Sequence, residues 1–211
     1  MHNLSDDGGT IIPLIVNGCV VNDSIVQEVL DYWEGLRDGR LVPKRSEIDP
    51  RALRKSLNHT FILEANTPDN IRFRLAGNKL CDCMGMEMRG MPAYAMIAQE
   101  GRNAFNEAIQ ACLASPQIVD FQLSPTARMV LLPMADEDNT ISRILGCVNV
   151  DPNNPDFPTR FTVRSMTQTR IIAAESILPK LVSELAEDQQ QFQPKPKKAA
   201  FAKPPHLRIV K

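Results

Sequence analysis

The spacing of the apolar side chains changes from helical to extended near residue 59, and this change most constrains the fold. Residues 71–76 alternate apolar side chains with arginines, the period-two pattern of a strand with one buried face. A similar run at 59–65 precedes it, and the turn residues 67–70 between them predict a β-hairpin. We therefore expect Arg72 and Arg74 on the solvent face of the sheet, and Ile71, Phe73 and Leu75 on its buried face.

Helical patterns flank this hairpin. Ser24-x-x-Gln27 is a capping box that opens an amphipathic helix ending at Gly39. Asp49-Pro50 supplies the N-cap and first residue of a short helix. A long helix is predicted over 97–113. The apolar positions of these three helices are Val26, Val29, Leu30, Trp33 and Leu36; Leu53 and Leu57; and Ile97, Ala104, Phe105, Ala108, Ile109, Cys112 and Leu113.

Three further strands are predicted at 118–123, 129–135 and 140–150. The expected fold is α+β, with a five-stranded antiparallel sheet, helices on one face and the 24–39 helix flanking it outside the core. The expected organisation is an N-terminal segment (1–23), a domain with its flanking helix (24–150), a linker and helical extension (151–191) and a disordered basic tail (192–211).

The charges of the 211-residue chain nearly balance, with 24 Lys and Arg against 25 Asp and Glu. We therefore expect no nucleic-acid partner. No apolar run approaches the roughly 20 residues of a membrane span. Asp6 and Asp7 precede the apolar stretch 10–21, where a signal peptide needs positive charge. With an odd number of cysteines as well, the sequence favours a cytoplasmic protein without a disulfide framework.

Three motifs carry a family resemblance: Trp33-x-x-x-Arg37-x-Gly-Arg40-x-x-Pro43-x-Arg45-x-x-x-Asp49-Pro50, Arg72-Phe-Arg-Leu-Ala-Gly77, and Gly85-Met-Glu-Met-Arg-Gly90. Over about residues 25–150 the chain resembles the small PAS-domain family of alphaproteobacteria once filed as a domain of unknown function, the PAS 5 group. Five strands with a helical insert after the second are also the PAS order. The resemblance implies a bacterial sensory or regulatory fold and no particular activity. Its motif and interface residues are Trp33, Arg37, Arg40, Pro43, Arg45, Pro50, Arg74, Gly77, Gly85 and Gly90.

The sequence carries no catalytic signature, and we expect no enzyme activity. Gly85-x4-Gly90 has the glycine spacing of a P-loop, but Met91-Pro92 follows where Lys-Ser/Thr must hold phosphates. Cys81-Asp-Cys83 has too short a spacing for a structural zinc site and lacks a second pair. The 97–113 helix has no histidine to ligate haem, and the flavin-binding cysteine motif of light-sensing PAS domains is missing. No metal or cofactor is predicted, whereas an unknown small ligand is compatible with the sequence.

Three functions remain open. The first is a regulatory protein without an output domain that binds a small ligand or a partner protein. The second is a ligand-free adaptor or dimerisation module. The third is a redox sensor using the Cys81 and Cys83 thiols, which would need a lowered pKa; buried, inert cysteines are the simpler interpretation.

Two surfaces are candidates for binding. The apolar stripe of the 24–39 helix would join a homodimer or a partner protein, unless the helix folds back onto its own sheet. The methionine-rich segment 84–96 would line a pocket beneath the 97–113 helix or fill the core there, and the two interpretations are equally supported. The expected pocket residues are Phe73, Met84, Met88, Phe105, Ile109 and Cys112.

Overall fold

The computed structural model describes residues 24–67, 70–124, 126–151 and 157–173. The expectations for the N-terminal segment and for the extension and tail beyond residue 173 lie outside these residues. No helix within the described part is long and apolar enough to cross a membrane. The helices are α1 (Ser24–Arg37), α2 (Asn78–Met84) and α3 (Arg102–Ala114), and the strands are β1 (Thr60–Thr67), β2 (Asn70–Ala76), β3 (Gln117–Ser124), β4 (Ala127–Ala135), β5 (Ile141–Val150) and β6 (Thr162–Arg170).

The strands form one antiparallel sheet in the order β2-β1-β5-β4-β3-β6, which confirms the α+β antiparallel fold. The sheet has six strands rather than the five predicted. The sixth, β6, pairs with β3 from Gln117↔Arg170 to Ser124↔Thr162, so the sheet continues beyond the boundary expected at residue 150. Most β6 side chains are exposed and polar. Because no buried face marks this strand, its sequence shows no period-two apolar pattern.

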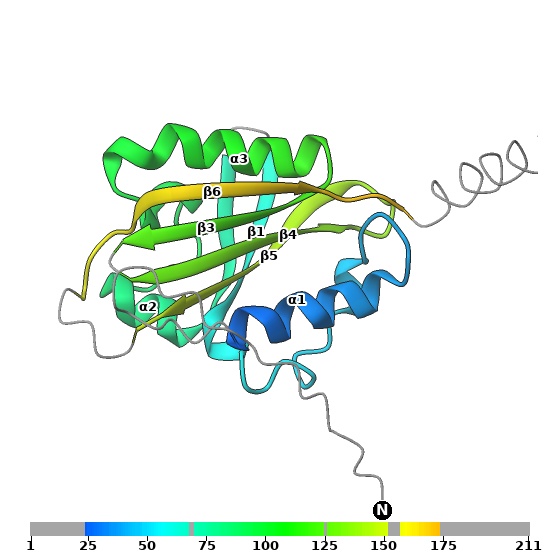
Figure 1. Cartoon of the computed structure of the whole chain (residues 1–211), viewed down its shortest axis with the longest axis horizontal. Helices are drawn as coiled ribbons and strands as arrows, with labels where there is room; N and C mark the ends of the chain where they lie inside the picture. The colour runs from blue at the N-terminus through cyan, green and yellow to red at the C-terminus, as the bar shows by residue number, and fades with distance from the viewer. Residues whose placement is uncertain (1–23, 68–69, 125, 152–156, 174–211) are drawn as a thin grey trace, which may run out of the picture. The chain divides into compact units, whose positions relative to one another are not determined.

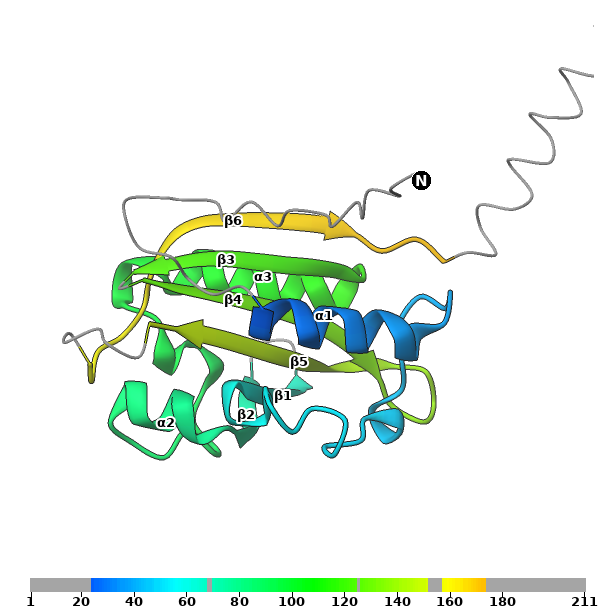
Figure 2. The ribbon, with the colours of Figure 1, turned by 60° about the horizontal axis from the view of Figure 1, so that its bottom comes forward.

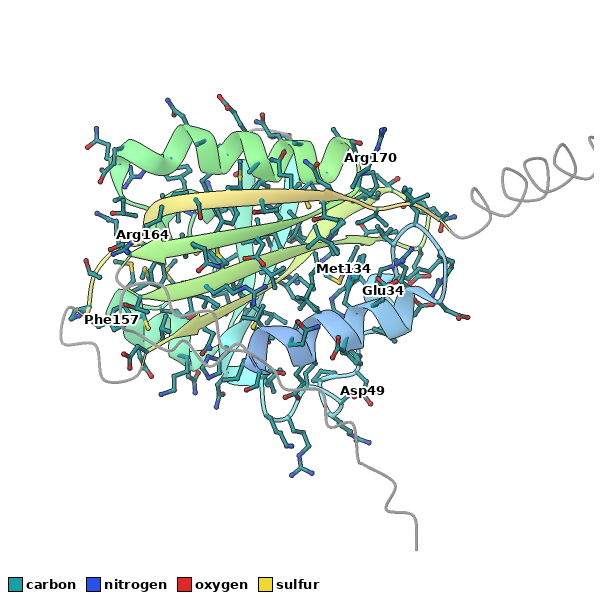
Figure 3. The ribbon with its side chains drawn as sticks, viewed as in Figure 1. Glu34, Asp49, Met134, Phe157, Arg164 and Arg170 are labelled. Carbon is teal, nitrogen blue, oxygen red and sulfur yellow. The ribbon has the colours of Figure 1, made fainter. Side chains whose placement is uncertain are left out.

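Helices cover both faces of the sheet, which corrects the expectation of helices on one face and a flanking helix outside the core. Figures 1 and 2 show α3 on one side of the strands and α1 on the other. On α1, Val26, Val29 and Trp33 are fully buried and pack with apolar side chains of β4 and β5. Figure 3 shows Met134 of β4 close to the half of α1 that carries Glu34. Most of the stripe expected as an interface therefore lies inside the monomer, with Leu30 and Leu36 half-buried at its edge.

The β1–β2 hairpin forms where the alternation predicted it. Arg72 and Arg74 are exposed and Phe73 is buried, as expected. Leu75, by contrast, is 47% exposed. The cause is a β-bulge: Leu63 pairs with Phe73 but Ile62 pairs with Leu75, which leaves Arg74 as an extra residue and reverses the alternation after it.

Two predicted helices differ in the structure. α3 begins at Arg102 rather than at residue 97; Ile97 is buried ahead of it, between two short 3₁₀ turns, and Ala104 is exposed. The 49–58 segment forms successive turns and a 3₁₀ turn, with hydrogen bonds such as Ser56 N to Leu53 O, 3.1 Å. In this tighter winding Leu53 is buried while Leu57 is 43% exposed.

Candidate functional site

The six residues expected to line a ligand pocket do come together, but as core. All six are buried in one apolar cluster beneath α3. The Phe105 ring packs against Phe121 at a centroid distance of 5.5 Å. Among the methionines of this region, Met88 and Met96 are fully buried, whereas Met86 is 44% exposed. The six expected pocket residues, together with Met96, therefore belong to the core of the α3 face, whereas Met86 lies outside it.

The two candidate redox thiols lie in different environments. Cys83 is buried on α2, and burial, followed by the charge of Asp82, raises the pKa of its thiol to about 11. A reactive cysteine needs a lowered pKa. Cys81 is half-buried, and its Sγ lies 3.9 Å from Oε1 of Glu87. The raised pKa of Cys83 is therefore the opposite of the lowered pKa that the redox hypothesis requires.

The opening motif starts with residues that fasten α1 to the sheet. Trp33 Nε1–H donates to the Pro133 carbonyl of β4 at 3.0 Å, while its ring is fully buried. The Arg37 guanidinium stacks over this ring, with Cζ 5.9 Å from the centroid, and also pairs with Glu34. Trp33 therefore holds the helix against the sheet, and Arg37 packs against Trp33 from the same helix.

The next motif residue, Arg40, caps the C-terminus of α1. Its Nη2–H and Nε–H donate to the carbonyls of Leu36 (2.6 Å) and Arg37 (3.1 Å), which have no partner within the helix. It also makes a bidentate pair with Glu47, at 3.0 and 2.9 Å. This pair lowers the pKa of the Glu47 carboxyl, which also accepts a hydrogen bond from Lys44 N. Arg40 therefore fixes the turn after α1.

Pro43 and the motif glycines have backbone roles. The Pro43 carbonyl accepts a hydrogen bond from Ala135 N at 3.0 Å. A Cβ on Gly77 would lie 2.3 Å from the Asn58 carbonyl oxygen, so only glycine fits beside the 49–58 turns. Gly85 (φ +65°) ends α2 in the left-handed region, and Gly90 (φ +81°) donates its N–H to the Phe73 carbonyl at 2.8 Å.

Three motif residues, Arg45, Pro50 and Gly77, line a cavity of about 290 Å³ between the 45–58 segment and the α1 face of β1, β2 and β5. We call it the motif cavity. The segment is held beside α1, where Asp49 N donates to the Tyr32 hydroxyl at 2.7 Å; Figure 3 shows Asp49 beside this helix. The lining is mostly apolar, with Ile48, Leu53, Leu57, Phe61, Ile62, Leu75 and Leu145 among its residues and with Asn58 and Asn78 as polar members.

A family comparison fits this geometry. A family model described as a PAS domain, the PAS 5 model, matches residues 21–149. The chain belongs to this PAS domain family. Comparisons with curated proteins and with solved structures found no match. The matched region of this PAS protein includes α1, the whole 45–58 segment and the motif cavity.

The sequence missed the cavity residues other than Arg45, Pro50 and Gly77. Leu57 and Leu75 stand at its rim and are both large, exposed apolar side chains. The sequence marked these positions only as apolar: Leu53 and Leu57 were expected on the buried face of an α-helix. The segment instead forms turns, and both side chains line the cavity. No group of three or more metal-ligating side chains occurs in the described ranges.

Proposed function

We propose that this PAS protein is a regulatory protein that senses a small molecule by binding it in the motif cavity. The PAS family suggests a sensory or regulatory role. The observation that carries the proposal is the apolar cavity, whose volume of about 290 Å³ lies near the small end of ligand sites. The expected pocket beneath α3, by contrast, is lined by side chains that pack together as core.

The position of the cavity suggests how binding would be transmitted. The 45–58 segment is connected to α1 through the Tyr32 contact, and the chain just before the segment is connected to the sheet, where Ala135 N donates to the Pro43 carbonyl. A ligand that fills the cavity would stabilise this segment against α1 and β1. We propose that a partner protein, or a second copy of the chain, binds the surface of this segment, where Leu57 is exposed.

Titration of the full chain with the neutral apolar dye N-phenyl-1-naphthylamine tests the proposal. We expect saturable, one-to-one binding with a rise in dye fluorescence. Leu57→Trp, which places a larger ring over the cavity mouth, should weaken binding at least about tenfold, a loss of about 1.4 kcal/mol. Leu41→Trp is the matched control, because Leu41 is 40% exposed and does not line the cavity.

Two results would contradict the proposal. Absence of saturable binding would favour the ligand-free adaptor. Equal weakening by both substitutions, or by neither, would place the bound dye outside the motif cavity. Far-ultraviolet circular dichroism of each variant establishes that the fold is retained.

A further inference from the structure

A second hollow adjoins the motif cavity and is rich in arginine. Its volume is about 480 Å³, and Arg45 and Leu75 line both spaces, so the two spaces are neighbours that share these side chains. Besides Arg45, the hollow takes Arg74 from the bulge of β2, Arg89 from the chain after α2 and Arg143 from β5; Asp136 and Glu137 also line it.

The acidic groups of this hollow already have partners. Arg143 pairs with Glu64 at 2.7 Å and with Asp136 at 2.8 Å, and Asp136 also accepts a hydrogen bond from the Ser142 hydroxyl. The Ser142 hydrogen bond, and then Arg143, lower the pKa of the Asp136 carboxyl, so it stays ionised at neutral pH. Glu137 lies 3.5 Å from Lys44 Nζ. Both acids that line the hollow therefore already have a cationic partner, although Arg143 is shared between Asp136 and Glu64.

The other three arginines are left without such partners. The side chains of Arg45, Arg74 and Arg89 make no ion pair or hydrogen bond with any residue in the described ranges. They come from three separate segments and line one hollow. Like charges gathered in this way repel one another, and an anion between them would relieve that repulsion with charge-assisted hydrogen bonds.

The β-bulge places an apolar side chain of the motif cavity next to one of these arginines. Arg74 lies on the face opposite Phe73, as the alternation predicts, and the bulge moves the following Leu75 from the α3 face to that same side, at the rim of the motif cavity. Bulges commonly redirect side chains in this manner next to functional sites. One local irregularity thus gives the cavity an apolar wall directly beside a cation of the hollow.

We propose that the two spaces form one site for an amphipathic organic anion. Its apolar body would occupy the motif cavity, and its carboxylate or phosphate would lie in the hollow against Arg45, Arg74 and Arg89. Arg45 stands where the two spaces meet, so the site selects molecules that carry both parts. This inference rests on the proposed function and adds to it the chemical class of the ligand.

Competition with the bound dye tests the inference, using decanoate, 1-decanol and inorganic phosphate as probes on the full chain. Decanoate should displace the dye at least about tenfold more strongly than decanol, and phosphate alone should displace little. Raising the salt concentration should narrow the difference, because salt screens exposed charges. Arg74→Gln and Arg45→Gln should each reduce the advantage of decanoate over decanol. Arg54→Gln is the matched control, since Arg54 is exposed on the same 45–58 segment as Arg45 but does not line the hollow.

The outcomes separate this inference from the proposed function. If the dye binds and decanol displaces it as well as decanoate does, the anion site is wrong while the apolar cavity stands. If the dye does not bind saturably, the proposed function fails first. If Arg54→Gln lowers the decanoate advantage as much as Arg74→Gln, the preference reflects general surface charge, which overturns the inference. Arg74 is exposed on an edge strand, so its substitution is expected to leave the fold intact.

Discussion

Replacing Trp33 with alanine is expected to lower the free energy of unfolding by about 3–5 kcal/mol. The indole ring is fully buried between α1 and the sheet. Its loss leaves a cavity and also leaves the Pro133 carbonyl without the donor at 3.0 Å. Urea unfolding monitored by far-ultraviolet circular dichroism measures the effect without needing the tryptophan as a probe.

Gln27→Ala is the control on the same helix. Gln27, expected from the sequence to complete a capping box, is exposed and among the described residues bonds only to Asp31 one turn on, at 2.7 Å. Its substitution should therefore change stability by no more than about 0.5 kcal/mol. If Trp33→Ala were as mild as Gln27→Ala, α1 would not be part of the core. The flanking-helix arrangement first expected from the sequence would then hold.

Phe105→Ala should cost a similar amount, about 3–5 kcal/mol, on the opposite face of the sheet. Phe105 is fully buried in the cluster beneath α3, and its ring packs against Phe121. Glu107→Ala on the same helix is the control, because Glu107 is exposed and should be nearly neutral. Equal midpoints of urea unfolding for the two variants would show that the buried face of α3 is assigned wrongly.

The sequence predicted the hairpin and three further strands because each carries its own local pattern. The alternation around Phe73 is visible without knowing any partner strand. Strand β6 carries no such pattern, because its side chains are mostly exposed and the strand is held by backbone pairing with β3. The packing of α1 onto the sheet was kept only as an alternative to an exposed stripe, although β4 is an almost continuous apolar run, buried over nearly its whole length. Such a run indicates a strand covered on both faces.

The candidate site was harder to predict than the fold. Apolar residues such as Phe105 and Leu53 look alike in sequence, and only the packed structure shows which fill a core and which line a cavity. The family motif did identify Arg45 and Arg74, but it gave no reason for their proximity. They line one hollow because the 45–58 segment lies beside β2. Leu75 joins the cavity wall through the bulge in β2, and a bulge depends on the register between two strands rather than on either strand alone.

The central claim is that this PAS protein binds its effector on the α1 face, in the motif cavity, and not beneath α3. Hydrogen–deuterium exchange of the full chain, with and without saturating N-phenyl-1-naphthylamine, tests the claim most directly. Slower exchange is predicted in peptides covering 45–58 and 72–77, whose residues line the motif cavity, with no change in peptides from α3. Slower exchange in α3, with 45–58 unchanged, would contradict the account.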